Sequence, residues 1–324
     1  MKKLTAVFCA CFCLASGAAF AQGGGKSGVK FPTKPITLIC PWTAGGGTDT
    51  VLRALGASLE KQLGVTVNVE NRTGGGGTIG HMAIKNARPD GYTVGMVTWE
   101  LSEYKKQGVA DITYADYDLL SRVNMDAAAI TVKADAPYNS LKEWIDYAKA
   151  NPGKINIGNS APLSVWHVAA ALVANQTGIE VKHVPFEGAA PAVTALAGGH
   201  IEAVSVSLPE VKGQLDAGNV KVLGLMDNER SKMYPNIPTL KEQGIDVVFG
   251  TWRGMALPKG VDPAIKDILA KALKAAQEDP AFIATAAKFN LKLAYQGPED
   301  FTAFLKQDLM DVSKTIDDTH LLDQ

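Results

Sequence analysis

The chain has 324 residues, of which 46% are hydrophobic, and its 32 basic and 33 acidic side chains leave a net charge of −1. A chain of this length can fill two hydrophobic cores, so we expect two domains. The balanced charge gives no sign of the basic patch by which proteins bind nucleic acids or anionic membrane surfaces, and neither partner is expected.

Residues 1–21 have the pattern of a secretory signal peptide. Two lysines precede a stretch of mostly apolar and small residues, and Ala19-Phe20-Ala21 fits the small-x-small cleavage pattern. We predict an exported chain whose mature form begins with a flexible leader, residues 22–30. A retained membrane anchor is the alternative, but the apolar stretch is marginal in length for spanning a bilayer. Removing the signal peptide leaves Cys40 as the one cysteine, which excludes a disulfide within the mature chain.

A glycine-rich loop follows the first predicted strand, Ile36–Ile39, and precedes a predicted helix over residues 50–62. Its three consecutive glycines, residues 45–47, allow a sharp turn and leave backbone N–H groups uncovered. Thr48 or Asp49 can cap the helix, whose first N–H groups and positive dipole end favour an anion. The pattern predicts an anion-binding loop, although an ordinary tight turn between a strand and a helix has similar residues.

The same arrangement then occurs again. A strand over 65–69 leads into the glycine run 74–77 and a short helix that ends near Ala87, and a third strand, 92–99, is apolar enough to be buried on both faces. Two strand–loop–helix units in succession predict a parallel α/β sheet. Both loops would lie at the carboxyl ends of strands, where such sheets bind ligands.

After residue 99 the pattern predicts a second α/β lobe. A strand over 126–132 is expected to cross into it, and Ser140 is expected to cap a helix. The expected elements are helices over 141–150 and 165–177, a helix opening after Phe186, and strands over 155–158, 181–185, 201–206 and 220–226. The chain is expected to return over 247–257, and helices over 263–277, 281–289 and 298–317 to cover the first lobe. Two lobes joined by two crossing segments would form a hinged clamp.

Enzyme and metal motifs are weak in this sequence. Gly75, Gly77 and Gly80 form a G-x-G-x-x-G pattern with Glu100 further on, which favours a dinucleotide, but an exported protein meets little of that cofactor. The chain has no G-x-S-x-G nucleophile motif, and its histidines lack metal-ligand spacing, so we expect no cofactor and no metal. His167, in the first turn of a helix, fits a packing role as well as a ligand contact.

The residues resemble the substrate-binding proteins of tripartite tricarboxylate transporters, the Bug or TctC-like receptors. The resemblance covers nearly the whole mature chain. The motifs that carry it are, in order, Phe31-Pro32-x-x-Pro35-Ile36, the loop from Pro41 to Asp49, Val69-Glu70-Asn71-Arg72 with its glycine run, Pro89-Asp90-Gly91-Tyr92-Thr93, His183-Val184-Pro185-Phe186-x-Gly188, Gly198-Gly199-x-Ile201-Glu202, Arg230, Pro235-x-Ile237-Pro238-Thr239-Leu240-x-Glu242-x-Gly244, Trp252-Arg253-Gly254 and Pro258-x-Gly260.

The resemblance implies a two-lobe periplasmic binding protein of α/β class, type II-like, each lobe a mostly parallel sheet flanked by helices and joined to the other by crossing strands at a hinge. Lobe 1 would comprise residues 31–123 and 249–324, and lobe 2 residues 124–248. Such a protein is a receptor and not an enzyme, works as a monomer, and delivers a small carboxylate to membrane transporter subunits or to a sensor.

The resemblance also implies a ligand site in which backbone N–H groups of the two first-lobe loops hold the ligand's carboxylate. The contacts expected from both lobes are Trp42, Thr43, Gly45, Gly46, Gly47, Thr48, Asp49, Gly76, Gly77, Thr78, Ile79, Trp99, Ser160, Ala161, Ser164, His167, Phe186, Gly188, Ala189 and Ser205. The carboxylate would need no buried arginine.

Several positions depart from the usual pattern of the family. Trp42 replaces a phenylalanine, residues 159–163 lack the usual glycine–serine character, and Glu202 and Ser205 stand where an aspartate-rich strand end is frequent. The part of the ligand beyond its carboxylate therefore stays open. A di- or tricarboxylate and an aromatic carboxylate are both candidates, aspartate and glutamate are less favoured, and an exported α/β enzyme or a dinucleotide-dependent oxidoreductase is the alternative.

Overall fold

The computed structural model describes residues 29–319 and 321. The predicted signal peptide, its cleavage point and most of the predicted leader lie outside the described residues. Within those residues, every helix falls short of the length or the apolar character that crossing a membrane requires.

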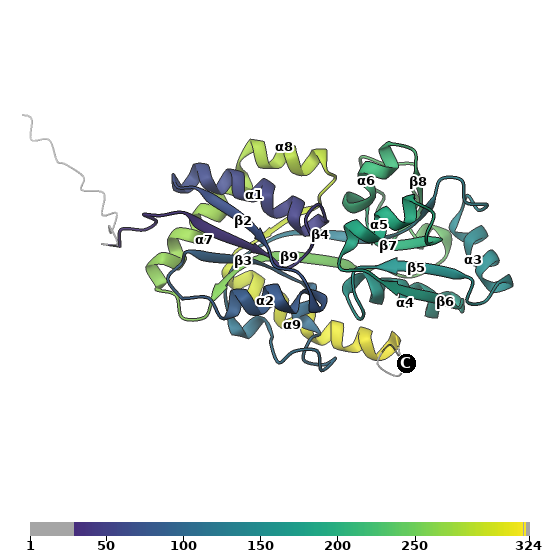
Figure 1. The fold of residues 1–324 in the computed structure, drawn as a ribbon, viewed down its shortest axis with the longest axis horizontal. Coiled ribbons are helices and arrows are strands. Elements are labelled where there is room, and N and C mark those ends of the chain that lie inside the picture. The colour runs from purple at the N-terminus through teal and green to yellow at the C-terminus, as the bar shows by residue number, and fades with distance from the viewer. Residues whose placement is uncertain (1–28, 320, 322–324) are drawn as a thin grey trace, which may run out of the picture.

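The described strands form one sheet that runs the length of an elongated molecule (Figure 1). Their order is β2-β1-β3-β9-β4-β7-β5-β6, and β10 and β8 also pair with β4. The strands are β1 Ile36–Cys40, β2 Val67–Asn71, β3 Thr93–Thr98, β4 Tyr117–Lys133, β5 Ile155–Asn159, β6 Val181–Pro185, β7 Ala203–Ser207, β8 Val220–Leu225, β9 Gly250–Pro258 and β10 Leu293–Gln296.

Helices cover both faces of this sheet. In Figure 1, α1 and α8 lie above its first half and α2 and α9 below it, while α3 to α6 surround the second half. The helices are α1 Gly47–Leu63, α2 Thr78–Lys85, α3 Leu141–Ala150, α4 Val165–Thr177, α5 Ala189–Ala197, α6 Leu208–Asp216, α7 Pro263–Glu278, α8 Pro280–Lys288 and α9 Pro298–Thr319.

The first half of the sheet confirms the predicted repeated strand–loop–helix unit. β1 pairs in parallel with both β2 and β3, so the two glycine loops leave the sheet at the same edge. The first helix, α1, buries Val51, Leu52, Leu55 and Leu59, whose spacing places them on one face. It ends where Gly64, with φ of 66°, turns the chain in the left-handed region.

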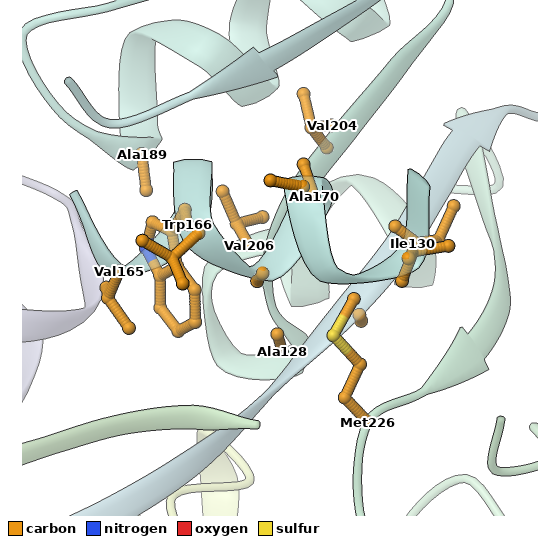
Figure 2. Packing of buried hydrophobic residues seen from close by; sticks show 14 of the residues in the cluster. Ala128, Ile130, Val165, Trp166, Ala170, Ala189, Val204, Val206 and Met226 are labelled. Carbon is orange, nitrogen blue, oxygen red and sulfur yellow. The ribbon is translucent and has the colours of Figure 1, made fainter. Parts of the chain in front are cut away.

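The second half is a similar unit built on β5, β6 and β7, which are parallel to one another. The predicted cap of α3 is confirmed, because the Ser140 side chain accepts a hydrogen bond from the Glu143 N–H. Helix α4 and strand β6 have the predicted bounds. Figure 2 shows side chains of α4 packed over the sheet beneath them, with labels on Val165, Trp166, Ala170, Val204, Val206, Ala128, Ile130 and Met226.

The crossing strand β4 is much longer than predicted. It begins at Tyr117 and pairs with β9 and β10 in the first half, then with β7 and β8 in the second. Register shifts between Leu119 and Ser121 and between Arg122 and Asn124 break the alternation of buried and exposed side chains. The first part of β4 therefore lacks the sequence period by which strands are predicted.

The last helix, α9, reaches further than predicted. It was expected to cover the first lobe, and it does pack on β4, but its end also contacts α4 in the second half. The Asn175 side chain donates to the backbone oxygens of Asp318 and Thr319, at 3.3 and 3.1 Å. This helix therefore joins the two halves in addition to β4.

The stability of a variant at Gly80 would show how tightly the two glycine loops are packed against each other. A Cβ on Gly80 would lie 2.4 Å from the Pro41 Cα and 2.7 Å from the Arg72 backbone oxygen, where nothing flexible can yield. We expect Gly80→Ala to lower the free energy of unfolding by about 1–3 kcal/mol in urea titrations.

The matched control is Gly213→Ala, also within a helix, because a Cβ there meets no atom within 4 Å. It should leave stability unchanged or raise it by up to about 1 kcal/mol. Equal effects of the two substitutions would show that α2 is free to shift away from Pro41.

Candidate functional site

The start of α1 differs from its prediction. The helix begins at Gly47 with Gly46 as its N-cap, so the expectation that Thr48 or Asp49 caps it is wrong. Gly45, with φ of 79°, makes the turn early and moves both residues into the first helical turn. From there the Asp49 carboxylate reaches back to accept from the Gly45 N–H at 2.9 Å.

Asp49 is held ionised by its neighbours. Burial acts to raise its pKa, but hydrogen bonds from Arg53, the Gly45 N–H and Asn71 outweigh burial and lower the pKa below its ordinary value. The Asn71 amide also donates to the Trp42 backbone oxygen at 2.9 Å. Asp49 thus fixes the shape of the first glycine loop from within the loop.

A protein carboxylate lies at the N-terminus of α1. The Gly47 N–H donates to Oε1 of Glu210 at 3.3 Å, although Glu210 belongs to α6 in the second half of the molecule. The other oxygen, Oε2, accepts from the Ser207 N–H and hydroxyl, both at 2.9 Å. The first N–H groups of a helix have no acceptor within the helix, so an anion is favoured there. The loop predicted to bind an anion holds one from its own chain.

Arg253 lies beside this carboxylate and is 2% exposed. It comes from β9, and its Nη1 donates to Asp126 Oδ2 of β4 at 2.6 Å while its Nε donates to Thr48 Oγ1 at 2.9 Å. Its Nη2 lies 3.6 Å from Glu210 Oε1. Burial raises the pKa of both Asp126 and Glu210, and the nearby guanidinium opposes that rise. One cation therefore joins four elements from both halves.

These charged residues were missed by sequence reasoning. Arg253 was noted only within a family motif, and a carboxylate site without a buried arginine was expected. A usable signal existed, because an arginine inside an apolar strand must find buried partners. A Ser207-x-x-Glu210 capping box, which the structure confirms at the start of α6, would also have revealed that helix.

A small cavity lies between the two halves, beside Arg253 and Glu210. Its volume is about 20 Å³, enough for a water molecule. Predicted site residues that line it are Trp42, Thr43, Gly46, Gly47, Thr48, Ser160 and Ala189. Lining residues that were not predicted are Thr98, Glu100, Val165, Trp166, Glu210, Thr251 and Arg253. The cavity as it stands is too small for a ligand of several carbon atoms.

A larger open groove of about 830 Å³ adjoins the cavity, and the two share Trp42, Glu100 and Ser160 in their walls. Further predicted residues that line the groove are Gly76, Gly77, Thr78, Ala161, Ser164 and Phe186. Glu103, Tyr104 and Gln107 line it too and were not predicted. The cavity and the groove therefore adjoin each other, with Trp42, Glu100 and Ser160 between them.

The remaining predicted site residues lie elsewhere. Gly188 faces the first loop across the halves, where a Cβ would come within 2.3 Å of Thr43 Oγ1. Trp99 packs edge-on against Phe249 in the core, and the His167 ring lies tilted against that of His183 with ring centroids 4.3 Å apart. The remaining three are Gly45 and Ile79, which are exposed, and Ser205, which is buried in β7.

The second glycine loop is a turn that hydrogen bonds stabilise, both within the loop and to the side chains of Tyr104 and His81. Its Gly77 and Ile79 N–H groups donate to the Gly74 oxygen, at 3.1 and 3.4 Å. Tyr104 donates its hydroxyl to the Gly76 oxygen at 2.7 Å, and His81 Nδ1 lies 2.9 Å from the Gly77 oxygen. Burial lowers the pKa of His81 to about 4, so its ring is neutral at pH 7. This loop shapes the groove, and its expected role in holding a carboxylate stays a prediction.

Two buried glutamates, Glu100 and Glu103, line the groove, and Glu100 also lines the cavity. Glu100 Oε1 accepts from the Val165 N–H at the start of α4, at 3.3 Å, and Oε2 accepts from the Thr98 hydroxyl. Glu103 Oε2 accepts from the Gln107 side chain. Burial raises the pKa of both carboxyls, and the neighbouring Glu100 raises that of Glu103 further, well above its ordinary value.

Comparison with known proteins gives consistent matches. The family model described as tripartite tricarboxylate transporter family receptor (TctC) matches residues 51–321. A Cupriavidus necator protein, the UPF0065 protein in the gbd 5′ region, is 33% identical over 278 residues, which cover 85% of this chain and 84% of that protein.

Two solved structures resemble the described fold. A TctC solute binding protein from Polaromonas, solved with no ligand, is 39% identical with a TM-score of 0.65, covering 89% of this chain and 99% of that one. The periplasmic binding protein BugD is 28% identical with a TM-score of 0.86, covering 90% of this chain and 99% of that one. The predicted periplasmic binding protein fold is confirmed. The matched family and these neighbours are solute-binding receptors and not enzymes, as predicted.

The raised pKa of Glu103 makes stability depend on pH. The folded chain holds this proton more tightly than the unfolded chain, so the contribution of Glu103 to stability is lost as pH rises above its ordinary value of 4.5. We expect Glu103→Gln to be more stable than the parent by about 1–3 kcal/mol at pH 8 and equal to it near pH 4. Urea unfolding at both pH values measures this, and Glu180→Gln, an exposed site, is the control. A pH-independent difference would contradict the buried placement.

Replacing Arg253 should expose the charges that it neutralises. Arg253→Met leaves Asp126 and Glu210 buried without a cation, so we expect a loss of about 3–5 kcal/mol in unfolding free energy at pH 8. The loss should shrink at pH 5, where the two carboxyls can bind protons. Arg88→Met, at a side chain that is 82% exposed, should change little at either pH. An identical loss at both pH values would mean that packing alone accounts for the effect.

Proposed function

The chain belongs to the tripartite tricarboxylate transporter receptor family, a family of periplasmic solute-binding proteins, and on this premise we propose that it captures a small carboxylate between its two halves. The ligand is a di- or tricarboxylate or an aromatic carboxylate. The bound receptor delivers it to membrane transporter subunits or to a sensor.

The carboxylate of Glu210 at the N-terminus of α1 is the observation that carries this proposal. The Gly47 N–H and the nearby Arg253 already bind a carboxylate of this shape and charge. Charge-assisted hydrogen bonds to N–H groups and guanidinium are the contacts that hold small carboxylates in proteins. A ligand carboxylate takes the place of Glu210 when the halves open and holds them together when they close.

The arrangement of the chain supports a hinged clamp. The proposed lobes are residues 31–123 with 249–324, and residues 124–248, and β4 and β9 carry the chain between them. The relative with greater sequence identity has the lower TM-score, 0.65 against 0.86, as a different placement of two lobes would produce. Opening would break the contacts from Gly47 to Glu210 and from Glu100 to Val165.

The proposed site combines the cavity with the groove. The carboxylate lies at residues 43–49 with Arg253, and the body of the ligand lies between Trp42 and Phe186, which line the cavity and groove. Aromatic walls of this kind suit an apolar or aromatic ligand body.

Thermal unfolding of the mature protein with a panel of carboxylates, followed by calorimetry, tests the proposal. A true ligand at about 100 times its Kd should stabilise the fold by about 2.7 kcal/mol. It should be recovered unchanged after incubation, whereas an exported enzyme would consume it. Tight binding of citrate with no binding of aromatic acids would exclude the aromatic class.

Gly47→Ala is the variant that addresses the carboxylate contact. A Cβ there would lie 2.7 Å from Arg253 Nη2 and 2.9 Å from Glu210 Oε1, closer than a side-chain carbon normally approaches, so it would push aside the groups around the carboxylate position. We expect affinity to fall by about tenfold or more, with Gly213→Ala as the unaffected control. Unchanged affinity in Gly47→Ala would place the carboxylate elsewhere.

A further inference from the structure

We propose that His167 is a positioning residue of the ligand groove, which fixes the backbone of Leu163 in the shape that Gln107 of the first half binds when the halves close. The inference rests on the proposed function, because it concerns the same groove and the same closure. It adds how one wall of the groove is held, and it gives His167 a role other than a ligand contact.

The wall in question is the segment 160–164, which lines the groove between β5 and α4. Within it Leu163 has a φ of 57°, in the left-handed region. Among the described residues other than glycine, Asn290 alone shares a positive φ, and asparagine adopts that region more readily than leucine does. The backbone of Leu163 therefore depends on contacts that hold it in place.

Two side chains hold the backbone of Leu163 from opposite directions. Its N–H donates to His167 Nδ1 at 2.9 Å, and its carbonyl oxygen accepts from the Gln107 side-chain amide at 3.0 Å. His167 lies in the first turn of α4, in the same half as Leu163, whereas Gln107 follows β3 in the first half. Opening of the halves would break the contact with Gln107 and leave the contact with His167. His167 thus keeps the carbonyl of Leu163 ready for Gln107.

The state of the His167 ring suits this role. A ring nitrogen that accepts a hydrogen bond carries no proton, so the proton of the neutral ring lies on Nε2. Burial, together with the neighbouring His183, lowers the pKa of His167 to about 3, so Nδ1 stays an acceptor at pH 7. The ring lies outside the described walls of both the cavity and the groove. His167 therefore acts on a ligand through Leu163.

Gln107 is itself held in the first half. Its side-chain amide donates to Glu103 Oε2 as well as to the Leu163 oxygen, so both hydrogens of the amide are used. The amide is thereby oriented before the halves meet. The contact between Gln107 and Leu163 joins two groups that are each fixed within their own half, which reduces the entropy lost on closure.

Amide hydrogen exchange of the ligand-free protein at pH 7 tests the contact of His167 directly. His167→Leu removes the acceptor and keeps a side chain of similar size. His167→Asn keeps an acceptor, because its Oδ1 lies as many bonds from the Cα as the histidine Nδ1 does. We expect the Leu163 N–H to exchange about tenfold or more faster in His167→Leu, and at nearly the parent rate in His167→Asn.

Calorimetry with glutarate, citrate and terephthalate as probes extends the test to binding. For each probe that binds the parent, we expect the affinity to fall by about tenfold in His167→Leu and by less than about threefold in His167→Asn. The control His200→Leu removes an exposed histidine outside the site and should leave the affinity unchanged. Circular dichroism and Tm of each variant confirm folding before titration.

A double-mutant cycle tests whether His167 and Gln107 act through the same backbone. Gln107→Leu alone should lower the affinity, and it should speed exchange of the Gly47 N–H, which donates to Glu210 of the other half. The double variant His167→Leu with Gln107→Leu should bind within about threefold of the weaker single variant, because each substitution already breaks the shared contact. Losses that multiply in the double variant would overturn the shared action through Leu163.

The remaining outcomes separate this inference from the proposed function. Equal losses in His167→Leu and His167→Asn would mean that packing of the ring matters and its acceptor does not, which overturns the inference and leaves the proposed function standing. Unchanged exchange at Leu163 in His167→Leu would overturn it as well. If neither the probes nor the wider panel bind the parent, the proposed function fails, whereas the exchange at Leu163 still supports or overturns the contact of His167.

Discussion

The contacts of one buried cation, Arg253, determine how the two halves meet. Its guanidinium joins Asp126 of the crossing strand, Thr48 of α1 and Glu210 of α6, and it is almost fully removed from solvent. Burying a guanidinium is costly unless its partners are placed well, so these contacts favour one relative position of the halves over others. The cavity beside it is small because those partners converge there.

On the proposed function, ligand binding exchanges the carboxylate of Glu210 for that of the ligand. In the described state it occupies the N-terminus of α1, where the ligand's carboxylate is proposed to lie. The net affinity is then the difference between two similar interactions, together with the change in contacts when the halves open. Selectivity must come from the parts of the ligand that Glu210 does not imitate, which gives the groove its importance.

Local patterns in the sequence were enough to predict the repeated strand–loop–helix units, because glycine runs and apolar strands are short-range signals. Helix α4 and strand β6 were predicted with their observed bounds for that reason. The start of β4 was not, because two register shifts disturb its period. The pairing of Gly47, Glu210 and Arg253 could not be predicted, since these residues are far apart in the sequence and meet only when the halves pack.

Glu100 makes a second contact between the halves, beside the one from Gly47 to Glu210. Its Oε1 accepts from the Val165 N–H at the start of α4, whereas Glu100 itself follows β3 in the first half, so the opening that the proposed function requires would break this hydrogen bond. Burial raises the pKa of the Glu100 carboxyl, because an ionised carboxylate is poorly solvated there. On the proposed function, the ligand therefore has to compensate for the contacts of two protein carboxyls that opening disrupts.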